Sequence, residues 1–323
     1  MSVSLAVPQA RPADLHHVRR MARTGEAFLA YLRAERGLST NTVDAYKQEV
    51  QTLLQFILDE GLTDWAQVTH RHIRGMLLNM TEAKYRRSTI RRRVSALRTF
   101  WKFLMREEQV TSNPFILVDL PKERKLLPRY LEESDAKRLL KIPGTRPVDL
   151  RDRALLHLAY SCGLRVAEVT GLRLRDVLPN AVRVFGKGSK ERIIPTDART
   201  LRYVRAYVGQ GRPALMNGQK TDRVFLRVRT GGVSGEGHPL DPRSVRLILA
   251  KYCQQAGIPY INPHGLRHSI ATHMLDHGAD IRIVQEFLGH ASINTTQVYA
   301  HVSKRKLQEA VAASHPSWQR GVE

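Results

Sequence analysis

The sequence predicts a protein that is mainly α with a small β-sheet, arranged in two domains. Its 323 residues exceed the usual size of a single hydrophobic core, so two domains are expected. Apolar residues recur every three or four positions through residues 25–108, which indicates a run of amphipathic helices. The period shortens to two around residues 173–195, where a Gly-Lys-Gly-Ser turn separates two short β-branched segments. These segments predict the strands of the small sheet.

The first domain is expected to be a helical bundle over residues 21–112, preceded by a flexible arm over residues 1–20. Polar residues suited to N-caps precede three of its apolar runs, namely Ser39, Thr69 and Ser88. The four helices are expected at Glu26–Arg36, Thr40–Glu60, His70–Asn79 and Thr89–Arg106.

The chain carries a strong positive charge, which indicates a polyanionic partner. Lys and Arg number 52 against 30 Asp and Glu, a net charge of +22. No apolar run approaches the ~20 residues of a membrane-spanning helix, and residues 1–17 lack the sustained apolar run of a secretory signal. We therefore expect a cytoplasmic protein that acts on nucleic acid and not on a membrane.

A dense group of basic residues lies where the fourth helix is expected to begin. A solvated basic face is the ordinary reason for such a group, but this density favours contacts with DNA phosphates. The candidate DNA-binding residues are Arg87, Arg91 and Arg92, within the group Lys84, Arg86, Arg87, Arg91, Arg92 and Arg93. After the bundle, the proline-containing and charged residues 113–128 are expected to form an interdomain linker.

The second domain, residues 129–323, is expected to place short helices around the small sheet. Gly278 and Gly289 follow apolar helical runs, where a left-handed C-cap is expected, and Asp280 is suited to the N-cap between them. Residues 209–237 are rich in glycine and are expected to be irregular. Helices are expected at Glu132–Lys141, Asp149–Cys162, Arg165–Gly171 and Asp197–Val208, from Pro242, from Pro263, and at Lys304–Ala313.

Histidine, arginine and tyrosine gather in residues 263–301. His264 and Arg267 are three positions apart at the start of a predicted helix, so their side chains leave the same face. His290 stands on a Leu-Gly-His corner, and Tyr299 follows nine positions later. Such residues are most often unrelated surface and core positions. Together they also suit a phosphodiester held by guanidinium and imidazole groups, with a phenol beside it.

Two segments further upstream contain more candidate charged residues, Arg165 with Glu168 in one and Lys187 in the other. Arg165 follows a helix-ending glycine, and Glu168 three positions later is expected either to orient its guanidinium or only to cap the helix. Lys187 lies in the Gly-Lys-Gly-Ser turn, where a lysine is usually exposed and idle, and the spacing is not that of a phosphate-binding P-loop. Lys190 and Arg192 beside it are expected to contact the DNA backbone, and Lys190 is the fourth candidate DNA-binding residue.

Five segments together resemble the motifs of the tyrosine recombinases, the phage-integrase-like family. They are GLRVAE at 163–168, GKGSKER at 186–192, HGLRH at 264–268, LGH at 288–290 and TQVYAH at 296–301. The order and spacing hold along the whole chain, and a final His315-Pro316 resembles the ending of the Xer branch, the chromosome-dimer resolvases.

The resemblance implies a fold and a set of roles. The fold would be an N-terminal four-helix core-binding (SAM-like) domain and an α+β catalytic domain, closed as a C-clamp around DNA, with a C-terminal exchange helix. Arg165 and Arg267 would hold the scissile phosphate, and Lys187 would protonate the departing 5′ oxygen. The implied catalytic residues are Arg165, Lys187, His264, Arg267, His290 and the nucleophile Tyr299, supported by Glu168.

The implied partner is a double-stranded DNA recombination site, present in two paired copies. The chain would act there as a homo-tetramer, or as a hetero-tetramer with a related recombinase, with a DNA translocase as a regulator. No cofactor, metal or ATP is expected. The i, i+4 histidine pairs His264 with His268 and His273 with His277 lack the further ligands of a zinc site.

Three alternative functions are compatible with the same sequence. A transposon or phage integrase would use the same residues, and a type IB topoisomerase would use the same chemistry for relaxation alone. A DNA-binding protein without activity is the third. Cys162 and Cys253 lie in apolar helical patterns and are expected to be buried thiols in a reducing compartment, not nucleophiles.

Overall fold

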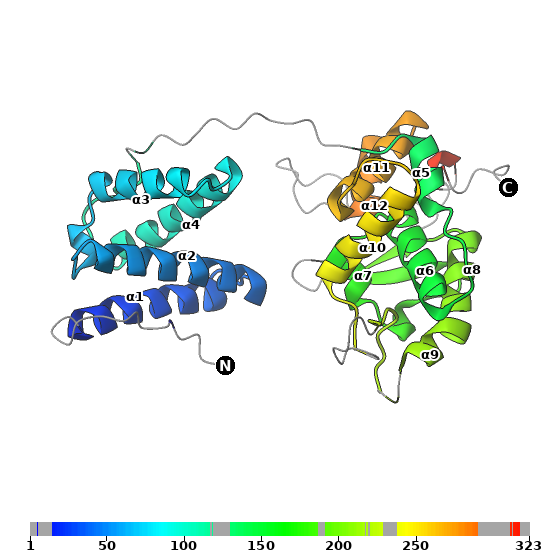
Figure 1. Cartoon of the computed structure of the whole chain (residues 1–323), viewed down its shortest axis with the longest axis horizontal. Coiled ribbons are helices and arrows are strands. Elements are labelled where there is room, and N and C mark those ends of the chain that lie inside the picture. Colours follow the sequence, from blue (N-terminus) through cyan, green and yellow to red (C-terminus); the bar gives the residue numbers. More distant parts are fainter. Residues whose placement is uncertain are drawn as a thin grey trace. The chain divides into compact units, whose positions relative to one another are not determined.

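The computed structural model of the chain divides into two compact units, Met1–Leu126 and Leu127–Glu323 (Figure 1). It describes residues 5, 15–116, 118, 130–186, 191–216, 218, 220–228, 238–289, 311 and 313–316. Helices dominate both units, and one small sheet lies in the second (Figure 1). The fold class predicted from the sequence, mainly α with a small β-sheet, is confirmed. No helix among the described residues has the length and apolar character needed to cross a membrane.

Four α-helices lie in the described part of the N-terminal unit, as predicted. They are α1 (Leu15–Ala34), α2 (Thr40–Asp59), α3 (His70–Glu82) and α4 (Arg87–Arg106). Aromatic rings fill the core between them, with Phe28 on Phe100 at 5.0 Å and Trp65 on Trp101 at 5.9 Å between ring centroids. The first pair is tilted and the second packs edge to face, and the large apolar areas that such rings bury hold the bundle together.

Two helix starts in this unit differ from the prediction. The first helix begins at Leu15 instead of Glu26, because Val18 and Met21 are buried in the bundle and extend the apolar face. The fourth begins at Arg87 after Arg86, so Ser88 lies inside the helix and is not its N-cap. The expected cap at Ser39 is confirmed, since its side chain accepts a hydrogen bond from the backbone N–H of Thr42.

The chain that leaves the bundle is fastened back onto α4. Arg98 donates hydrogen bonds to the carbonyl oxygens of Phe115 (2.9 Å) and Val118 (3.2 Å). The Phe115 ring is fully buried and lies 5.3 Å from that of Trp101. The Arg98 guanidinium therefore binds the backbone of its own unit.

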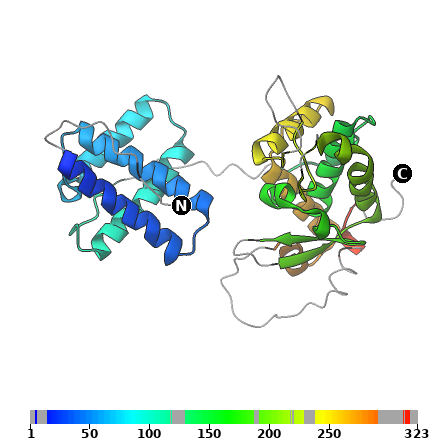
Figure 2. The same ribbon diagram turned by 90° about the horizontal axis from the view of Figure 1, so that it is seen from below.

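The C-terminal unit is organised around a buried helix, α6 (Pro147–Ser161), which packs against α5, α7, α8, α9 and α11. The sheet is an antiparallel hairpin of β1 (Ala181–Phe185) and β2 (Glu191–Pro195), in which Val184 lies opposite Arg192. Figure 2 shows this hairpin at one edge of the unit. The remaining helices are α5 (Glu133–Leu140), α7 (Val166–Gly171), α8 (Ala198–Ala206), α9 (Arg212–Met216), α10 (Pro242–Gln255), α11 (Pro263–Asp276) and α12 (Ile281–Leu288).

Part of the segment expected to be irregular is helical. A π-helical turn, Tyr207–Gly211, continues α8 directly into α9. Buried Tyr207 stacks on Phe225 at 5.7 Å between ring centroids, and Arg212 donates to the backbone oxygens of Thr221 and Arg223. These long-range contacts overcome the low helix propensity of the glycines here.

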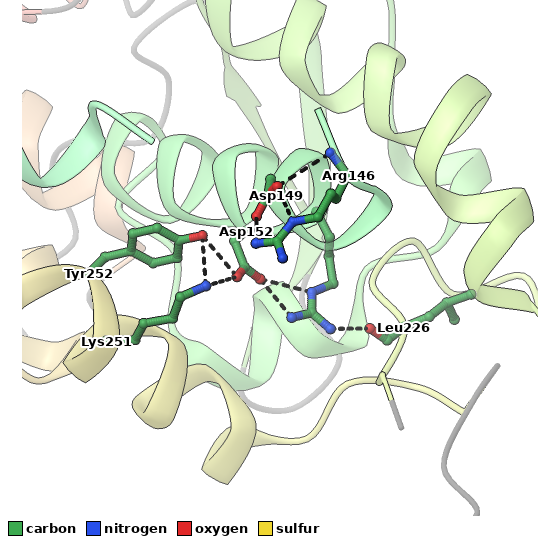
Figure 3. A network of polar contacts seen from close by, with 7 residues as sticks. Arg146, Asp149, Asp152, Leu226, Lys251 and Tyr252 are labelled. Carbon is green, nitrogen blue, oxygen red and sulfur yellow. Dashed lines mark hydrogen bonds and ion pairs between the residues drawn. The ribbon is translucent and has the colours of Figure 1, made fainter. Parts of the chain in front are cut away.

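A polar network ties α6 to α10 (Figure 3). Arg151 donates two hydrogen bonds to Asp152, at 2.9 and 2.7 Å, and a third to the carbonyl of Leu226 at 3.0 Å. From α10, the Tyr252 hydroxyl donates to Asp152 at 3.2 Å, and the Lys251 ammonium lies 3.6 Å from it. We call Arg151, Asp152, Lys251 and Tyr252 the Asp152 cluster.

Candidate functional site

The first predicted arginine stands on a fixed corner. Gly163 ends α6 in the left-handed region, at φ +53°, and a Cβ there would lie 2.5 Å from a Leu288 methyl group. Glycine is therefore required at this turn on two grounds. Arg165 follows as the N-cap of α7, so its side chain starts from a position set by the packed end of α6.

Glu168 both caps α7 and orients the Arg165 guanidinium. The sequence had left these two roles as alternatives. Its carboxylate accepts from the backbone N–H of Arg165 at 2.8 Å and from the guanidinium at 2.9 Å. Burial alone would raise the pKa of Glu168, but hydrogen bonds from Arg192 and Arg165 outweigh this effect and hold the pKa below its usual value. The carboxylate therefore stays ionised beside the arginines.

Arg267 reaches the same carboxylate from α11. That helix begins at Pro263 as predicted, and Asn262 caps it by accepting from the N–H of Gly265 at 2.8 Å. The Arg267 guanidinium donates to the carbonyl oxygens of Gly163 and Leu288, and it lies 3.9 Å from Glu168. Burial, together with the nearby Arg165, lowers the pKa of Arg267 to about 10, so it remains charged at neutral pH.

A third guanidinium, from Arg192 on β2, binds Glu168 with two hydrogen bonds of 2.8 and 2.9 Å. The sequence alone predicts for Arg192 no more than a contact with the DNA backbone. Its place here depends on the hairpin packing against α7, a contact between distant segments that no local pattern reveals. We call Arg165, Glu168, Arg192 and Arg267 the Glu168 cluster.

The Glu168 cluster is suited to an anion. Its three guanidiniums and one carboxylate leave a net charge of +2. The Arg165 side chain remains 42% exposed, and its bonds to Glu168 and Gly289 use two of the five N–H groups of the guanidinium. Guanidiniums bind phosphate oxygens with paired hydrogen bonds, and a partly buried site strengthens that attraction.

The structure brings together two of the six predicted catalytic residues. Arg165 and Arg267 meet at Glu168, while His264 is exposed on the first turn of α11. Lys187, His290 and Tyr299 lie outside the described residues. Gly289, immediately before His290, has φ +65° and ends α12 as predicted, and its carbonyl accepts from Arg165 at 3.1 Å. The chain thus enters the His290 segment directly from the cluster.

The other histidines of α11 belong to the framework. His273 is buried, accepts from the Tyr160 hydroxyl at 2.8 Å, and donates to the carbonyl of Leu131 at 2.6 Å. His277 contacts Glu133 and His268 contacts the Tyr130 ring. These contacts join the start of the C-terminal unit to α11, which carries Arg267.

Both cysteines are buried and free of disulfides, as predicted. Cys162 is closest in sequence to the cluster, but burial raises the pKa of its thiol to about 12. A thiol with that pKa supplies almost no thiolate at neutral pH, so it is a poor nucleophile.

The three candidate DNA-binding arginines of the N-terminal unit, Arg87, Arg91 and Arg92, are all exposed at the start of α4. Arg92 also donates to Glu49 at 2.6 Å. Arg93 also binds Glu49, which is 1% exposed. Sequence reasoning missed Glu49, although its spacing from Leu53 places it beside the apolar stripe of α2. Lys190, the fourth candidate, lies outside the described residues.

Two family patterns match the chain. Residues 129–306 match the Phage integrase family, and residues 26–108 match the Phage integrase N-terminal SAM-like domain. Tyrosine recombinase XerC of Halalkalibacterium halodurans is 40% identical over 298 residues, which span 90% of this chain and 96% of that protein. Tyrosine recombinase XerD of Oceanobacillus iheyensis is 38% identical over 296 residues, which span 90% and 97%.

Solved structures share the fold. XerH site-specific recombinase, bound to a palindromic difH substrate in a post-cleavage complex, matches with a TM-score of 0.63 and 20% identity, over 95% of this chain and 91% of that one. A lambda integrase dimer bound to a COC′ core site matches with a TM-score of 0.61 and 16% identity, over 87% and 98%. At these identities the likeness concerns the fold alone.

Proposed function

The chain belongs to the phage integrase family, in its Xer-type tyrosine recombinase branch, and on this premise we propose that it recombines DNA sites through a 3′-phosphotyrosine at Tyr299. The observation that carries the proposal is the convergence of Arg165 and Arg267 on Glu168. These guanidiniums come from separate elements, α7 with its N-cap and α11, and together they exceed the charge of the carboxylate that lies beside both. Such an excess suits a phosphodiester whose negative charge grows during cleavage.

The proposed reaction begins with attack of the Tyr299 hydroxyl on the scissile phosphorus. Because the ordinary pKa of tyrosine is about 10, the phenol needs help to lose its proton at neutral pH. His264 assists that transfer, and His290 adds a hydrogen bond to a phosphate oxygen. Lys187 gives a proton to the departing 5′ oxygen, so the products are a 3′-phosphotyrosine and a free 5′ hydroxyl.

Religation follows from the same chemistry in reverse. The phosphotyrosine keeps the energy of the broken phosphodiester, so a 5′ hydroxyl from the same or another duplex can attack it. The phosphate bond then returns to DNA and Tyr299 recovers its proton. Neither ATP nor a metal ion enters this balance.

In the cell we propose that the chain resolves chromosome or plasmid dimers at segregation, acting in the cytoplasm on the nucleoid. Two sites are paired in a tetramer, made of this chain alone or of this chain and a related recombinase, and a DNA translocase regulates the exchange. Both XerC and XerD proteins are similar to the chain at comparable identity, which supports this class of reaction. We also propose that both units contact the duplex, with Arg87, Arg91, Arg92 and Lys190 on its backbone.

The test is recombination of a supercoiled plasmid carrying one or two copies of the DNA that this chain traps covalently in cells. Two copies in direct repeat should give two smaller circles, and Tyr299→Phe should give none. Relaxation of a one-site plasmid without resolution would indicate a topoisomerase instead. A shifted band without any change in the DNA would indicate a binding protein, and joining of two unlike sites would indicate an integrase.

A further inference from the structure

We propose that Arg192 is a positioning residue of the cleavage reaction, which keeps Glu168 saturated so that Arg165 and Arg267 stay available to the phosphate. The inference rests on the proposed function, because it names how the clamp of that reaction is held. It concerns a residue on β2, outside the helices that carry the two clamping arginines.

The first observation is that Glu168 has no spare acceptor positions. Arg165 donates its backbone N–H and one guanidinium N–H, at 2.8 and 2.9 Å. Arg192 donates two more, at 2.8 and 2.9 Å, so each carboxylate oxygen accepts one bond from each arginine. A carboxylate offers about four lone-pair positions, and these four donors fill them.

The second observation is that the guanidiniums of Arg267 and Arg165 lie next to the Glu168 carboxylate. Arg267 lies 3.9 Å from Glu168, too far for a hydrogen bond, and donates to the carbonyls of Gly163 and Leu288. Without Arg192, two acceptor positions on a buried anion would open beside Arg267 and the remaining N–H groups of Arg165. Both guanidiniums would then be drawn onto Glu168 and away from a ligand, since an unsatisfied buried carboxylate is costly.

The third observation is that the fold makes room for Arg192 at Gly289. A Cβ at Gly289 would lie 2.9 Å from Cδ and 3.0 Å from Cζ of Arg192, closer than side chains normally approach. The arginine stem thus lies against the backbone that Arg165 also contacts and that leads directly to His290. Arg192 therefore contacts both Glu168, which binds Arg165, and the backbone at Gly289.

The Arg192 side chain is only 16% exposed, and its two terminal nitrogens are both taken by Glu168. It therefore contributes through Glu168 and does not need to touch the substrate. A lysine could keep the charge, but it could not make the paired bonds that leave one N–H on each carboxylate oxygen.

The experiment compares Arg192→Met and Arg192→Lys with the wild type and with the control Arg183→Met. Arg183 pairs with Glu191 at 3.2 Å on the same hairpin, but its side chain leaves the opposite face of the sheet from Arg192. The probe is a nicked suicide duplex with the DNA sequence recovered from covalent complexes in cells. Its SDS-resistant adduct is followed in single turnover, and DNA affinity is measured by band shift.

We expect Arg192→Met to slow adduct formation by about 10- to 100-fold, on the scale known for loss of a partner that orients a metal ligand, with DNA affinity unchanged. Arg192→Lys should stay slow, and Arg183→Met should match the wild type. Should Arg192→Met fail to fold, as thermal melting would show, Arg192→Lys carries the same comparison.

A second substrate separates positioning from a framework role. With a methylphosphonate at the scissile position, the charge that the clamp must neutralise is removed, so the loss caused by either Arg192 variant should shrink several-fold. An equal loss on both substrates, or full activity of either variant on the phosphodiester, would overturn the inference. A wild-type chain that forms no Tyr299 adduct on the phosphodiester would overturn the proposed function, and the inference with it.

Discussion

Asp152 and Glu168 are two of the buried carboxylates of the C-terminal unit, and the basic residues around them are arranged differently toward an anionic ligand. Asp152 is held by Arg151, whose third donor goes to the Leu226 carbonyl, and by Tyr252 from α10 (Figure 3). Arg151 and Asp152 are 6% and 1% exposed, so this ion pair is closed to solvent and links α6 to α10, with the 43% exposed Lys251 ammonium 3.6 Å away at its edge. In the Glu168 cluster Arg165 is 42% exposed, and guanidiniums outnumber the carboxylate three to one.

Two properties separate a charged cluster that stabilises the fold from one that can bind a ligand: how deeply it is buried, and whether its cationic groups outnumber its carboxylates. A buried ion pair that is closed to solvent matters to the fold mainly because breaking it leaves an unpaired buried charge. A cluster with surplus cationic donors at an exposed edge keeps binding capacity. The two clusters therefore predict opposite outcomes when their charges are removed.

The largest expected effect is on stability, in the Asp152 cluster. Asp152→Asn should lower the free energy of unfolding by about 3–5 kcal/mol, because it leaves buried Arg151 without its counter-charge. Urea unfolding measures it, and cleavage per folded molecule should not change. The matched control is Asp222→Asn, whose exposed pair with Arg173 should be worth less than about 1 kcal/mol. Equal losses in the two variants would erase the distinction between the clusters.

The next effect is on activity, in the Glu168 cluster. Arg165→Met should lower the rate of covalent adduct formation by about 100- to 1000-fold, the usual cost of removing one donor that stabilises developing charge. Its unfolding free energy should fall by less than in Asp152→Asn, because Glu168 keeps the two bonds from Arg192 and the one from the backbone N–H of residue 165. A large loss of stability with normal activity in the folded fraction would place Arg165 with Arg151, as part of the framework.

Acid should unfold the C-terminal unit through two buried imidazoles before it disturbs the Glu168 cluster. Burial lowers the pKa of His157 and of His315 to about 4, against 6.5 when unfolded. The unfolded chain binds these protons first, so stability falls as the pH drops from 6.5 to 4, by up to about 3 kcal/mol for each imidazole. The Glu168 pKa is held low, so the stability from its ion pairs is present above pH 4.5 and lost only below its folded pKa.

Stability curves of wild type and His315→Gln against pH provide the measurement. The variant should lose about half of the decline between pH 6.5 and 4.5. His315 donates to the carbonyl of Ser161 at the end of α6, and a glutamine amide can make the same kind of bond. An unchanged slope in the variant would show that another group takes up the protons.

Features of the fold that depend on neighbouring residues could be predicted from the sequence, and features that depend on distant residues could not. The starts of α10 and α11 and the ends at Gly278 and Gly289 were predicted correctly, since proline, Asx caps and positive-φ glycines act within one turn. The pairing of Arg165 with Glu168 was also within reach, because i and i+3 residues adjoin on a helix.

What the sequence missed depends on contacts between distant segments. Arg192 meets Glu168 only because the hairpin packs on α7, and Glu49 meets Arg92 and Arg93 only because α2 packs on α4. The start of α1 at Leu15 could not be predicted, because its first turns contain mostly histidine and arginine around a few buried apolar residues. Burial, not composition, decides these features.

The smallest expected effect extends the comparison to the N-terminal unit. Arg91→Gln should weaken DNA binding uniformly across sequences and lower the slope of log affinity against log salt by about 1, as loss of one phosphate contact does. Arg106→Gln is the control, since Arg106 pairs with Glu35 and Glu107 at the other end of α4. A salt slope that Arg91→Gln leaves unchanged would remove this residue from the DNA contact.

The central claim is that Tyr299 becomes joined to a broken DNA strand beside the arginines of the Glu168 cluster. Mass spectrometry of the peptide that remains attached to DNA, after digestion of the trapped complex, tests it most directly. The 3′ phosphate of the DNA should be found on Tyr299, and Tyr299→Phe should form no adduct. Attachment to any other residue, or an adduct that persists in the phenylalanine variant, would contradict the claim.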